Sequence, residues 1–277
     1  MDTELNLILA ATGKTGRRVA ARLRLRGARV RAASRSSATR FDWDDPAGWD
    51  PALAGVTDIY VVPPSEPSSI HEFVARAEKA GVRRLVLLSG HGADRWTDTT
   101  FGPDMRSAED AVRGSALDWT VVRAANFFQN FEEIYRDSLL DGQLALPVGA
   151  APEPFVDVED VADAAAAVLL EPGTHSQRVY ELTGARALTY AEAVELIART
   201  ADRPATYRQV SPAEYIATLV GQGWSEAEAR QDADMYALIE RGIIADTTDD
   251  VATLLGREPR SFEDYVVRAA AAGTWRS

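Results

Sequence analysis

Residues 5–27, with the sequence LNLILAATGKTGRRVAARLRLRG, decide the fold. Leu5–Ala10 is an apolar run that predicts a buried strand, and Thr15–Leu25 has the composition of a helix. The short loop between them contains Gly13 and Gly16. A strand, a glycine loop and a helix in this order are typical of the phosphate-binding turn of a dinucleotide-binding domain. A plain strand-to-helix turn is the alternative.

The glycine loop has the residues that such a phosphate site requires. Gly13 would let the backbone approach a pyrophosphate, and Gly16 would let the helix pack closely on the strand. Free N–H groups at the start of the helix would hold the phosphate charge. From this loop we expect the cofactor-binding residues Thr12, Gly13, Lys14, Thr15, Gly16 and Arg17.

Strand and helix patterns continue to alternate along the chain. Further strands are expected at Ala28–Ala33, Asp58–Val62, Arg84–Leu88, Trp119–Val122 and Arg178–Leu182. Further helices are expected at Ile70–Ala80, Met105–Arg113, Asp157–Leu170, Tyr190–Arg199, Ala213–Gln222, Ser225–Arg241 and Phe262–Ala271. This alternation predicts an α/β protein with a Rossmann-type, doubly wound parallel sheet and a smaller, mostly helical substrate lobe. We expect residues 1–125 and 155–185 to form the dinucleotide-binding domain, and residues 126–154 and 186–277 the lobe.

Composition narrows the classes of function. The 277 residues are 46% hydrophobic and carry a net charge of −12, from 30 basic and 42 acidic side chains. Nucleic-acid binding is therefore not expected, because it draws on clustered Lys and Arg. The absence of cysteine excludes disulfides and thiolate chemistry, and three scattered histidines make a metal site unlikely. With no secretory leader or membrane-spanning run recognised, we expect a cytoplasmic protein without membrane contacts.

The end of the second expected strand, Ala33–Ser36, indicates which dinucleotide binds. In this architecture that strand end lies beside the adenosine ribose, where an acidic residue would bind the 2′-hydroxyl of NAD and an arginine accommodates the 2′-phosphate of NADP. Ser34 and Arg35 stand there, so NADPH is the expected cofactor. The alternative is that Arg35 is an ordinary solvated surface arginine.

Several longer motifs resemble those of one protein family. They are Phe41–Asp45 (FDWDD), Tyr60–Pro64 (YVVPP), Gly81–Ser89 (GVRRLVLLS), Arg123–Phe131 (RAANFFQNF) and Ile239–Phe262. Together with the glycine loop, they resemble the NmrA-like atypical short-chain dehydrogenases, whose loop reads G-x-x-G-x-x-G. Ala10 replaces the first glycine. The closest resemblance is to the agroclavine dehydrogenase and festuclavine synthase subgroup of ergot alkaloid pathways and its bacterial relatives.

The resemblance implies further site residues at the ends of the later strands. Those for the cofactor are Asp42 and Trp43 near the adenine, Pro63 and Pro64 along the cofactor, and Ser89 and Gly90 near the nicotinamide. Those for the substrate are Asn126, Phe127 and Phe128, with Met105. For the two phenylalanines, ordinary core packing is the alternative.

The usual catalytic pair of short-chain dehydrogenases, a Tyr with a Lys four residues later, cannot form in this chain. Its only lysines are Lys14 and Lys79, and alanine stands four residues before each. A cationic iminium ion accepts hydride without such an acid, and it would favour a pocket with carboxylates or aromatic faces. The candidate catalytic residues are Ser89 and His91, although an exposed loop histidine is the favoured interpretation of His91.

These features predict an NADPH-dependent reductase that acts on a small imine, an iminium ion or a related electrophile. Two alternatives remain open, an NADPH-dependent quinone reductase and a non-catalytic redox sensor that binds the dinucleotide. The expected partner is a small-molecule substrate. Apolar helix surfaces would permit a homodimer.

Overall fold

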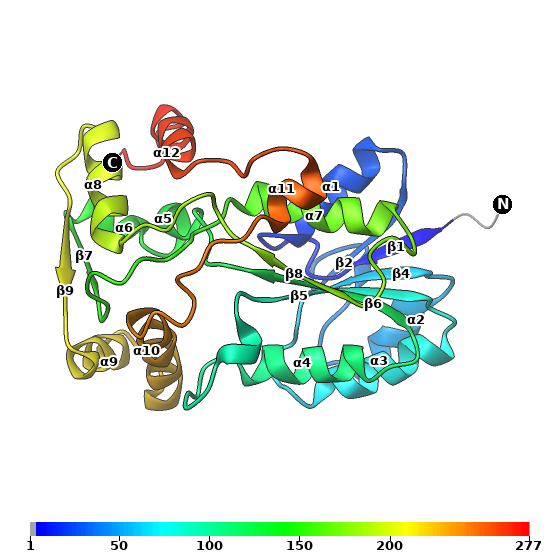
Figure 1. Cartoon of the computed structure of the whole chain (residues 1–277). Helices are drawn as coiled ribbons and strands as arrows, with labels where there is room; N and C mark the ends of the chain where they lie inside the picture. Colours follow the sequence, from blue (N-terminus) through cyan, green and yellow to red (C-terminus); the bar gives the residue numbers. More distant parts are fainter. Residues whose placement is uncertain (1–3, 277) are drawn as a thin grey trace.

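A seven-stranded sheet forms the centre of the computed structural model, which describes residues 4–276 (Figure 1). The strand order is β3-β2-β1-β4-β5-β6-β8, and every neighbouring pair is parallel. The strands are β3 Thr39–Arg40, β2 Arg29–Ser34, β1 Leu5–Ile8, β4 Asp58–Val61, β5 Arg84–Gly90, β6 Asp118–Ala124 and β8 Arg178–Leu182. The expected Rossmann-type sheet is confirmed. Its order reverses between β1 and β4, where ligands of open α/β sheets bind beyond the carboxyl ends of the strands.

Helices cover both faces of this sheet (Figure 1). One face carries α1 Gly16–Leu25, α7 Val158–Leu170 and α11 Asp250–Leu255; the other carries α2 Trp49–Leu53, α3 Ser69–Lys79 and α4 Pro103–Arg113. Short 3₁₀ turns, η1 Pro46–Gly48 and η2 Ala93–Arg95, precede α2 and α4. The run Ala164–Ala167 lets α7 pack closely between the sheet and its neighbours, since the first three of these alanines are completely buried.

A second, smaller lobe lies beyond the carboxyl ends of the strands (Figure 1). It contains α5 Asn130–Glu133, α6 Arg136–Leu140, α8 Tyr190–Thr200, α9 Pro212–Gly221, α10 Glu226–Glu240 and α12 Phe262–Ala271. A parallel pair of strands, β7 Gln143–Leu146 and β9 Thr206–Gln209, forms its small sheet. Aromatic side chains from these elements form a separate core, so the lobe has its own hydrophobic interior.

The chain between α10 and α12 returns to the large sheet. Val251 of α11 is buried among the residues on the α7 side of the sheet. Asp250 accepts a hydrogen bond from the backbone N–H of Glu181 in β8, at 2.7 Å. The dinucleotide-binding unit therefore includes α11. Within residues 4–276, no helix is both long and apolar enough to cross a membrane.

Candidate active site

The glycine loop leaves no room for side chains where the backbone turns into α1. A Cβ at Gly16 would lie 2.3 Å from the carbonyl oxygen of Ala10 and 2.7 Å from that of Leu9. A Cβ at Gly13 would lie 3.2 Å from the same Ala10 oxygen. Ala10 has a φ of +49°, a conformation that favours the glycine it replaces. The loop thus has the close helix–strand approach and the exposed backbone that a pyrophosphate needs.

The start of α1 is suited to an anion. Thr15 occupies the N-cap position without a side-chain capping bond, so the first N–H groups of the helix are not used by its hydroxyl. Thr12 and Gly13 line the adjoining groove. Lys14 turns to the other side of the loop, where its Nζ lies 3.0 Å from Asn130 Oδ1 and 3.0 Å from Glu133 Oε2. Arg17 is more exposed, with Nη2 3.9 Å from the same Glu133.

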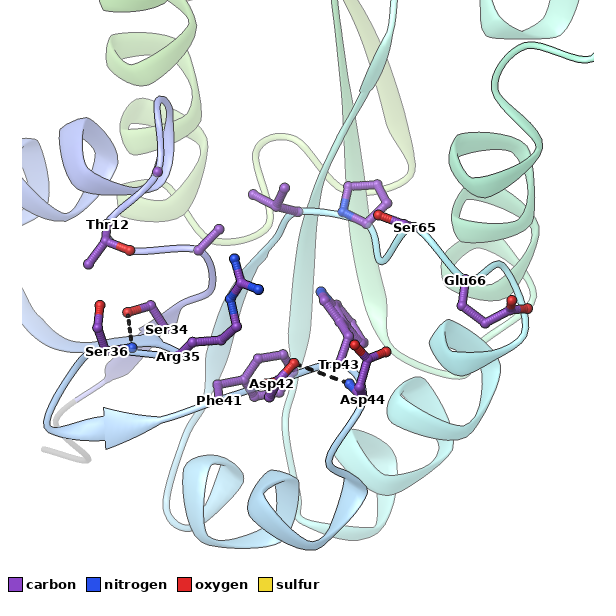
Figure 2. Close-up of a pocket in the computed structure, with 14 residues that line it drawn as sticks. Thr12, Ser34, Arg35, Ser36, Phe41, Asp42, Trp43, Asp44, Ser65 and Glu66 are labelled. Carbon is purple, nitrogen blue, oxygen red and sulfur yellow. Dashed lines mark hydrogen bonds between the residues drawn. The ribbon is translucent and has the colours of Figure 1, made fainter. Parts of the chain in front are cut away.

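A groove of about 800 Å³ runs from this loop past the ends of β2 and β4 (Figure 2). Ser34 is buried at the end of β2; its Oγ lies 2.7 Å from Ser37 Oγ and accepts the Ser36 N–H. The Arg35 side chain extends toward the middle of the groove (Figure 2). Among the residues described, nothing pairs with its guanidinium through a hydrogen bond or salt bridge. Arg35 is therefore free to meet a phosphate that enters the groove.

The far side of this groove combines an aromatic surface with acidic groups. Trp43 packs against Phe41 with a ring-centroid distance of 5.0 Å, in an edge-to-face arrangement. Asp42 is held in place because its carbonyl accepts the Trp49 Nε1–H bond at 2.8 Å. Pro63 lines the groove after β4. Pro64 is buried behind it and is not among the lining residues, so only its backbone position supports the expected cofactor contact.

A second cavity of about 240 Å³ lies at the ends of β5 and β6, on the Lys14 side of the glycine loop. Its wall is mainly apolar: Leu88, Gly90, Trp96, Phe101, Met105, Ala124, Ala125, Phe127, Met235 and Ile244. Its polar lining residues are Lys14, Ser89, His91, Asn126, Asn130 and Glu153. The loop after β1 thus contributes to both cavities, as a site for a dinucleotide and its hydride acceptor requires.

Of the three expected substrate residues after β6, two line this cavity and one does not. Asn126 and Phe127 face it. Phe128 is only 2% exposed and packs in the aromatic core against Phe262, with ring centroids 5.1 Å apart. Phe127 forms an isolated parallel bridge with Val156, and the next residue, Phe128, packs into the core of the lobe. The alternative of ordinary core packing is correct for Phe128.

Ser89 belongs to a buried network of charges beneath the cavity. Its hydroxyl donates to Glu109 Oε1 at 2.7 Å. Arg123 binds both oxygens of Glu109, at 2.8 and 2.7 Å, and reaches Glu181 Oε1 at 2.8 Å. Burial opposes the charge of Arg123, but its carboxylate partners raise its pKa above the ordinary value. The Ser89 proton is therefore directed toward Glu109.

His91 is buried, and its interpretation as an exposed loop histidine is wrong. The residue is 2% exposed, and its backbone N–H continues the pairing of β5 with β6 through Ala124 O. Its Nδ1 lies 2.7 Å from Glu181 Oε2, and its Nε2 lies 3.4 Å from Arg95 and 3.6 Å from Asp246. His91 lines the second cavity, but both ring nitrogens face charged side chains of the protein.

Sequence reasoning missed Glu153, which the fold brings to the second cavity from a loop far along the chain. Its carboxyl is completely buried and accepts hydrogen bonds from Asn126 Nδ2 and, at 2.9 Å, from the Tyr190 hydroxyl. Burial raises the pKa of Glu153 to about 7, although both hydrogen bonds oppose this effect. A lone acidic residue between Pro152 and Pro154, in an apolar stretch, was the only signal for it in the sequence.

A glycine-loop groove joined to an apolar cavity at the carboxyl ends of a parallel sheet defines an NAD(P)H-dependent oxidoreductase. Comparison with known proteins supports this class. Residues 10–172 match the model of a family described as NAD(P)H-binding. The uncharacterized oxidoreductase YesF of Bacillus subtilis is 32% identical over 98% of this chain and 96% of its own. The chain belongs to this NAD(P)H-binding family, and its cofactor is a nicotinamide dinucleotide.

Other relatives show how broad this family is. Agroclavine dehydrogenase of Claviceps fusiformis is 27% identical over 82% of this chain and 81% of its own. Further relatives are named for azo and quinone substrates. In fold, the NADPH complex of the Escherichia coli quinone oxidoreductase QOR2 matches with a TM-score of 0.83 and 23% identity, over 95% of this chain and 99% of that one. The family is therefore established, whereas membership of the ergot alkaloid subgroup remains a prediction.

Proposed function

We propose that the protein transfers a hydride from NADPH to a small, cyclic imine or iminium ion. The observation that carries this proposal is Glu153, a buried carboxyl in the wall of an otherwise apolar cavity. Among the described residues, its hydrogen-bond partners are the neutral side chains of Asn126 and Tyr190. A carboxyl in such surroundings lacks a cation, and a protonated nitrogen of the substrate would supply one.

The residues around the two cavities fit the proposed cofactor. Gly13, Gly16 and the uncapped start of α1 suit the pyrophosphate, and Arg35 suits a 2′-phosphate. Bound NADPH would supply the hydride. The chain would contribute the apolar walls that exclude water and orient the acceptor, among them Phe127 and Met105.

Two features favour an iminium ion as the hydride acceptor: the missing Tyr–Lys pair and the aromatic wall of the cavity. No Tyr–Lys pair spaced four residues apart exists in the sequence, so the usual acid for a ketone is missing. An iminium carbon is already electrophilic and needs orientation more than activation. The aromatic faces of Phe101 and Phe127 suit a flat cation.

The direct test is NADPH consumption by purified protein with three acceptors offered separately: a cyclic iminium ion, a simple quinone and an azo dye. We expect the iminium ion to give the highest kcat/KM. Faster turnover of the quinone would replace the proposal by the quinone reductase alternative. Saturable NADPH binding without turnover of any acceptor would favour a redox sensor.

The preference for NADPH over NADH has its own test. Arg35→Ala should weaken NADPH binding about 10- to 100-fold, because a charge-assisted bond to the 2′-phosphate is lost, and should leave NADH binding nearly unchanged. Arg26→Ala, at the exposed far end of α1, is the matched control. Equal losses for both dinucleotides on titration calorimetry would argue against a 2′-phosphate contact.

A further inference from the structure

We infer that Glu153 is the acid that protonates the nitrogen of a neutral imine, and that the buried tyrosines behind it resupply the proton. This inference rests on the proposed function, because it concerns the acceptor bound in the same cavity. It extends the substrate class from iminium ions, which need no proton, to neutral imines, which do.

The other polar groups of the cavity are already engaged with charged partners. Lys14 lies 3.0 Å from Glu133, and Ser89 donates to Glu109. His91 is 2.7 Å from Glu181 at one nitrogen and faces Arg95 at the other. Glu153 differs because it is held only by neutral donors in the described part of the chain. A proton on its carboxyl would not compete with a fixed ion pair.

The inner part of the proton path begins directly behind Glu153. Tyr190 donates to Glu153 Oε2 at 2.9 Å, and its ring packs edge-to-face on that of Tyr135, with centroids 6.0 Å apart. The hydroxyls of Tyr135 and Tyr236 are 2.9 Å apart. Burial raises the pKa of all three tyrosines, so each stays a neutral hydroxyl that can both donate and accept a proton.

The outer part of the path leads to the surface of the lobe. The rings of Tyr236 and Tyr215 pack edge-to-face, with centroids 5.4 Å apart. Tyr215 donates to Asp232 Oδ2 at 2.7 Å. Asp232 is half-buried, and burial raises the pKa of its carboxyl. Asp232 is thus the point where protons from solvent would enter the path. Rotation of the tyrosine hydroxyls would carry them from one hydrogen-bonded pair to the next and on to Glu153.

The proposed step balances in atoms and charge. The O–H bond of the Glu153 carboxyl breaks and an N–H bond forms on the imine, which becomes an iminium ion. A hydride, with both its electrons, then adds to the iminium carbon and gives a neutral amine, while NADPH is oxidised to NADP⁺. The Glu153 carboxylate takes up a proton from Tyr190, which is replenished in turn from Tyr135.

The surroundings of Glu153 suit a group that changes its protonation state near neutral pH. Burial raises the pKa of Glu153 to about 7, against the hydrogen bonds from Tyr190 and Asn126 and a smaller effect of His91. Tyr190 and Tyr135 face it from the lobe, and Lys14 lies in the same cavity wall. The acid and base forms are thus both accessible at the pH where a general acid works best.

The test compares a neutral imine with a permanent cation in the Glu153→Gln variant. The probes are 3,4-dihydroisoquinoline, at a pH above its own pKa, and its N-methyl iminium ion. We expect kcat for the imine to fall about a hundredfold or more. For the N-methyl ion we expect KM to rise, because the variant lacks the carboxylate that pairs with the cation, while kcat changes about threefold or less. Equal losses for the two probes, or no loss for the imine, would overturn the inference. Failure of the wild-type protein to reduce either probe would instead contradict the proposed function.

A second readout does not depend on turnover. Infrared difference spectra of the protein without NADPH should show the carbonyl band of a protonated carboxyl that disappears when the neutral imine binds. The same band should be missing in Glu153→Gln and present in Glu195→Gln, a control at an exposed position of α8. A band that persists on imine binding would show that no proton moves to the ligand, and would overturn the inference.

The tyrosine path is tested by a matched pair of substitutions. Tyr190→Phe removes the hydroxyl next to Glu153 and should slow imine reduction about tenfold or more, with the N-methyl ion much less affected. Tyr265→Phe removes another buried hydroxyl that has no hydrogen-bond partner among the described residues, and should leave both rates unchanged. Equal rates in the two variants would remove Tyr190 from the path.

Discussion

The two sides of the small cavity hold carboxyl groups with different partners: an arginine on one side and neutral hydrogen-bond donors on the other. Beneath the cavity, Glu109 and Glu181 share Arg123. Burial raises the pKa of Glu181, but hydrogen bonds from His91 and Arg123 outweigh burial, and the pKa is below its ordinary value. On the lobe side, Glu153 has only neutral donors, and burial raises its pKa to about 7. Burial alone therefore does not decide the charge of a carboxyl here; the charge of its partner does.

This difference gives the two sides of the cavity different roles. The Arg123 side carries fixed charges that bind one another, so it can hold the ends of β5, β6 and β8 in register. The Glu153 side carries a group that is close to its titration point and next to neutral hydroxyls. We therefore place proton transfer at Glu153. Protonating a carboxylate of the Arg123 network would break an ion pair, which costs free energy.

The largest expected effect comes from removing the shared cation. Arg123→Met would remove the arginine that binds both oxygens of the buried Glu109 and one oxygen of Glu181, and should lower the free energy of unfolding by about 3–5 kcal/mol at pH 7. The loss should shrink as the pH falls and the two carboxylates take up protons. Urea denaturation at several pH values measures both effects.

A matched control for this substitution is Arg95→Met. Arg95 pairs with Asp246 at 2.7 Å, but both side chains are about half exposed. Its loss should therefore cost about 1 kcal/mol or less. If Arg123→Met were no more destabilising than Arg95→Met, the network beneath the cavity would not be held together by charge.

The next effect concerns the pH dependence of stability on the Glu153 side. The pKa of Glu153 rises from its ordinary value of 4.5 to about 7 on folding. The folded protein thus holds this proton more tightly than the unfolded chain does. The resulting stabilisation is fully present below pH 4.5 and is lost as the pH rises through 7. As the pH rises from below 4.5 to above 7, ionisation of Glu153 should lower the free energy of unfolding by about 3 kcal/mol.

Glu153→Gln cannot ionise, so it should remove this part of the pH dependence. The fall in unfolding free energy between pH 5 and pH 8 should be smaller in the variant by about 3 kcal/mol. Chemical denaturation at the two pH values gives the difference, with Glu195→Gln as the exposed control. An unchanged pH dependence would mean that Glu153 is ionised throughout, like the carboxylates on the opposite side.

The cofactor side of the molecule was predictable because its signals are local in the sequence. The strand, the glycine loop and the helix are consecutive, and Gly16 is required by atoms of Leu9 and Ala10 a few residues away. The same holds for Arg35, which directly follows β2. The short strands β7 and β9 were missed, because each has only four residues and the two strands pair with each other across about 60 residues of sequence.

The substrate side depends on contacts that the sequence does not display. Glu153 and Tyr190 are 37 positions apart, and they meet because the loop around Glu153 pairs with Leu188. The motif after β6 correctly predicted that this segment lies at the cavity, but nothing in the motif indicated that Phe128 packs in the aromatic core. His91 was misjudged for a related reason, since its burial depends on Glu181 of β8, 90 positions later.

The smallest expected effect tests Ser89, a candidate catalytic residue whose hydroxyl the structure directs into the charged network. Ser89→Ala removes one donor to Glu109, which keeps both hydrogen bonds from Arg123. Unfolding should therefore become easier by only about 1 kcal/mol. Imine reduction should change a few-fold at most, because the proton comes from the opposite side of the cavity. A hundredfold loss of kcat with intact stability would mean that the Ser89 hydroxyl leaves Glu109 for the substrate, and the chemistry would then move to the Arg123 side.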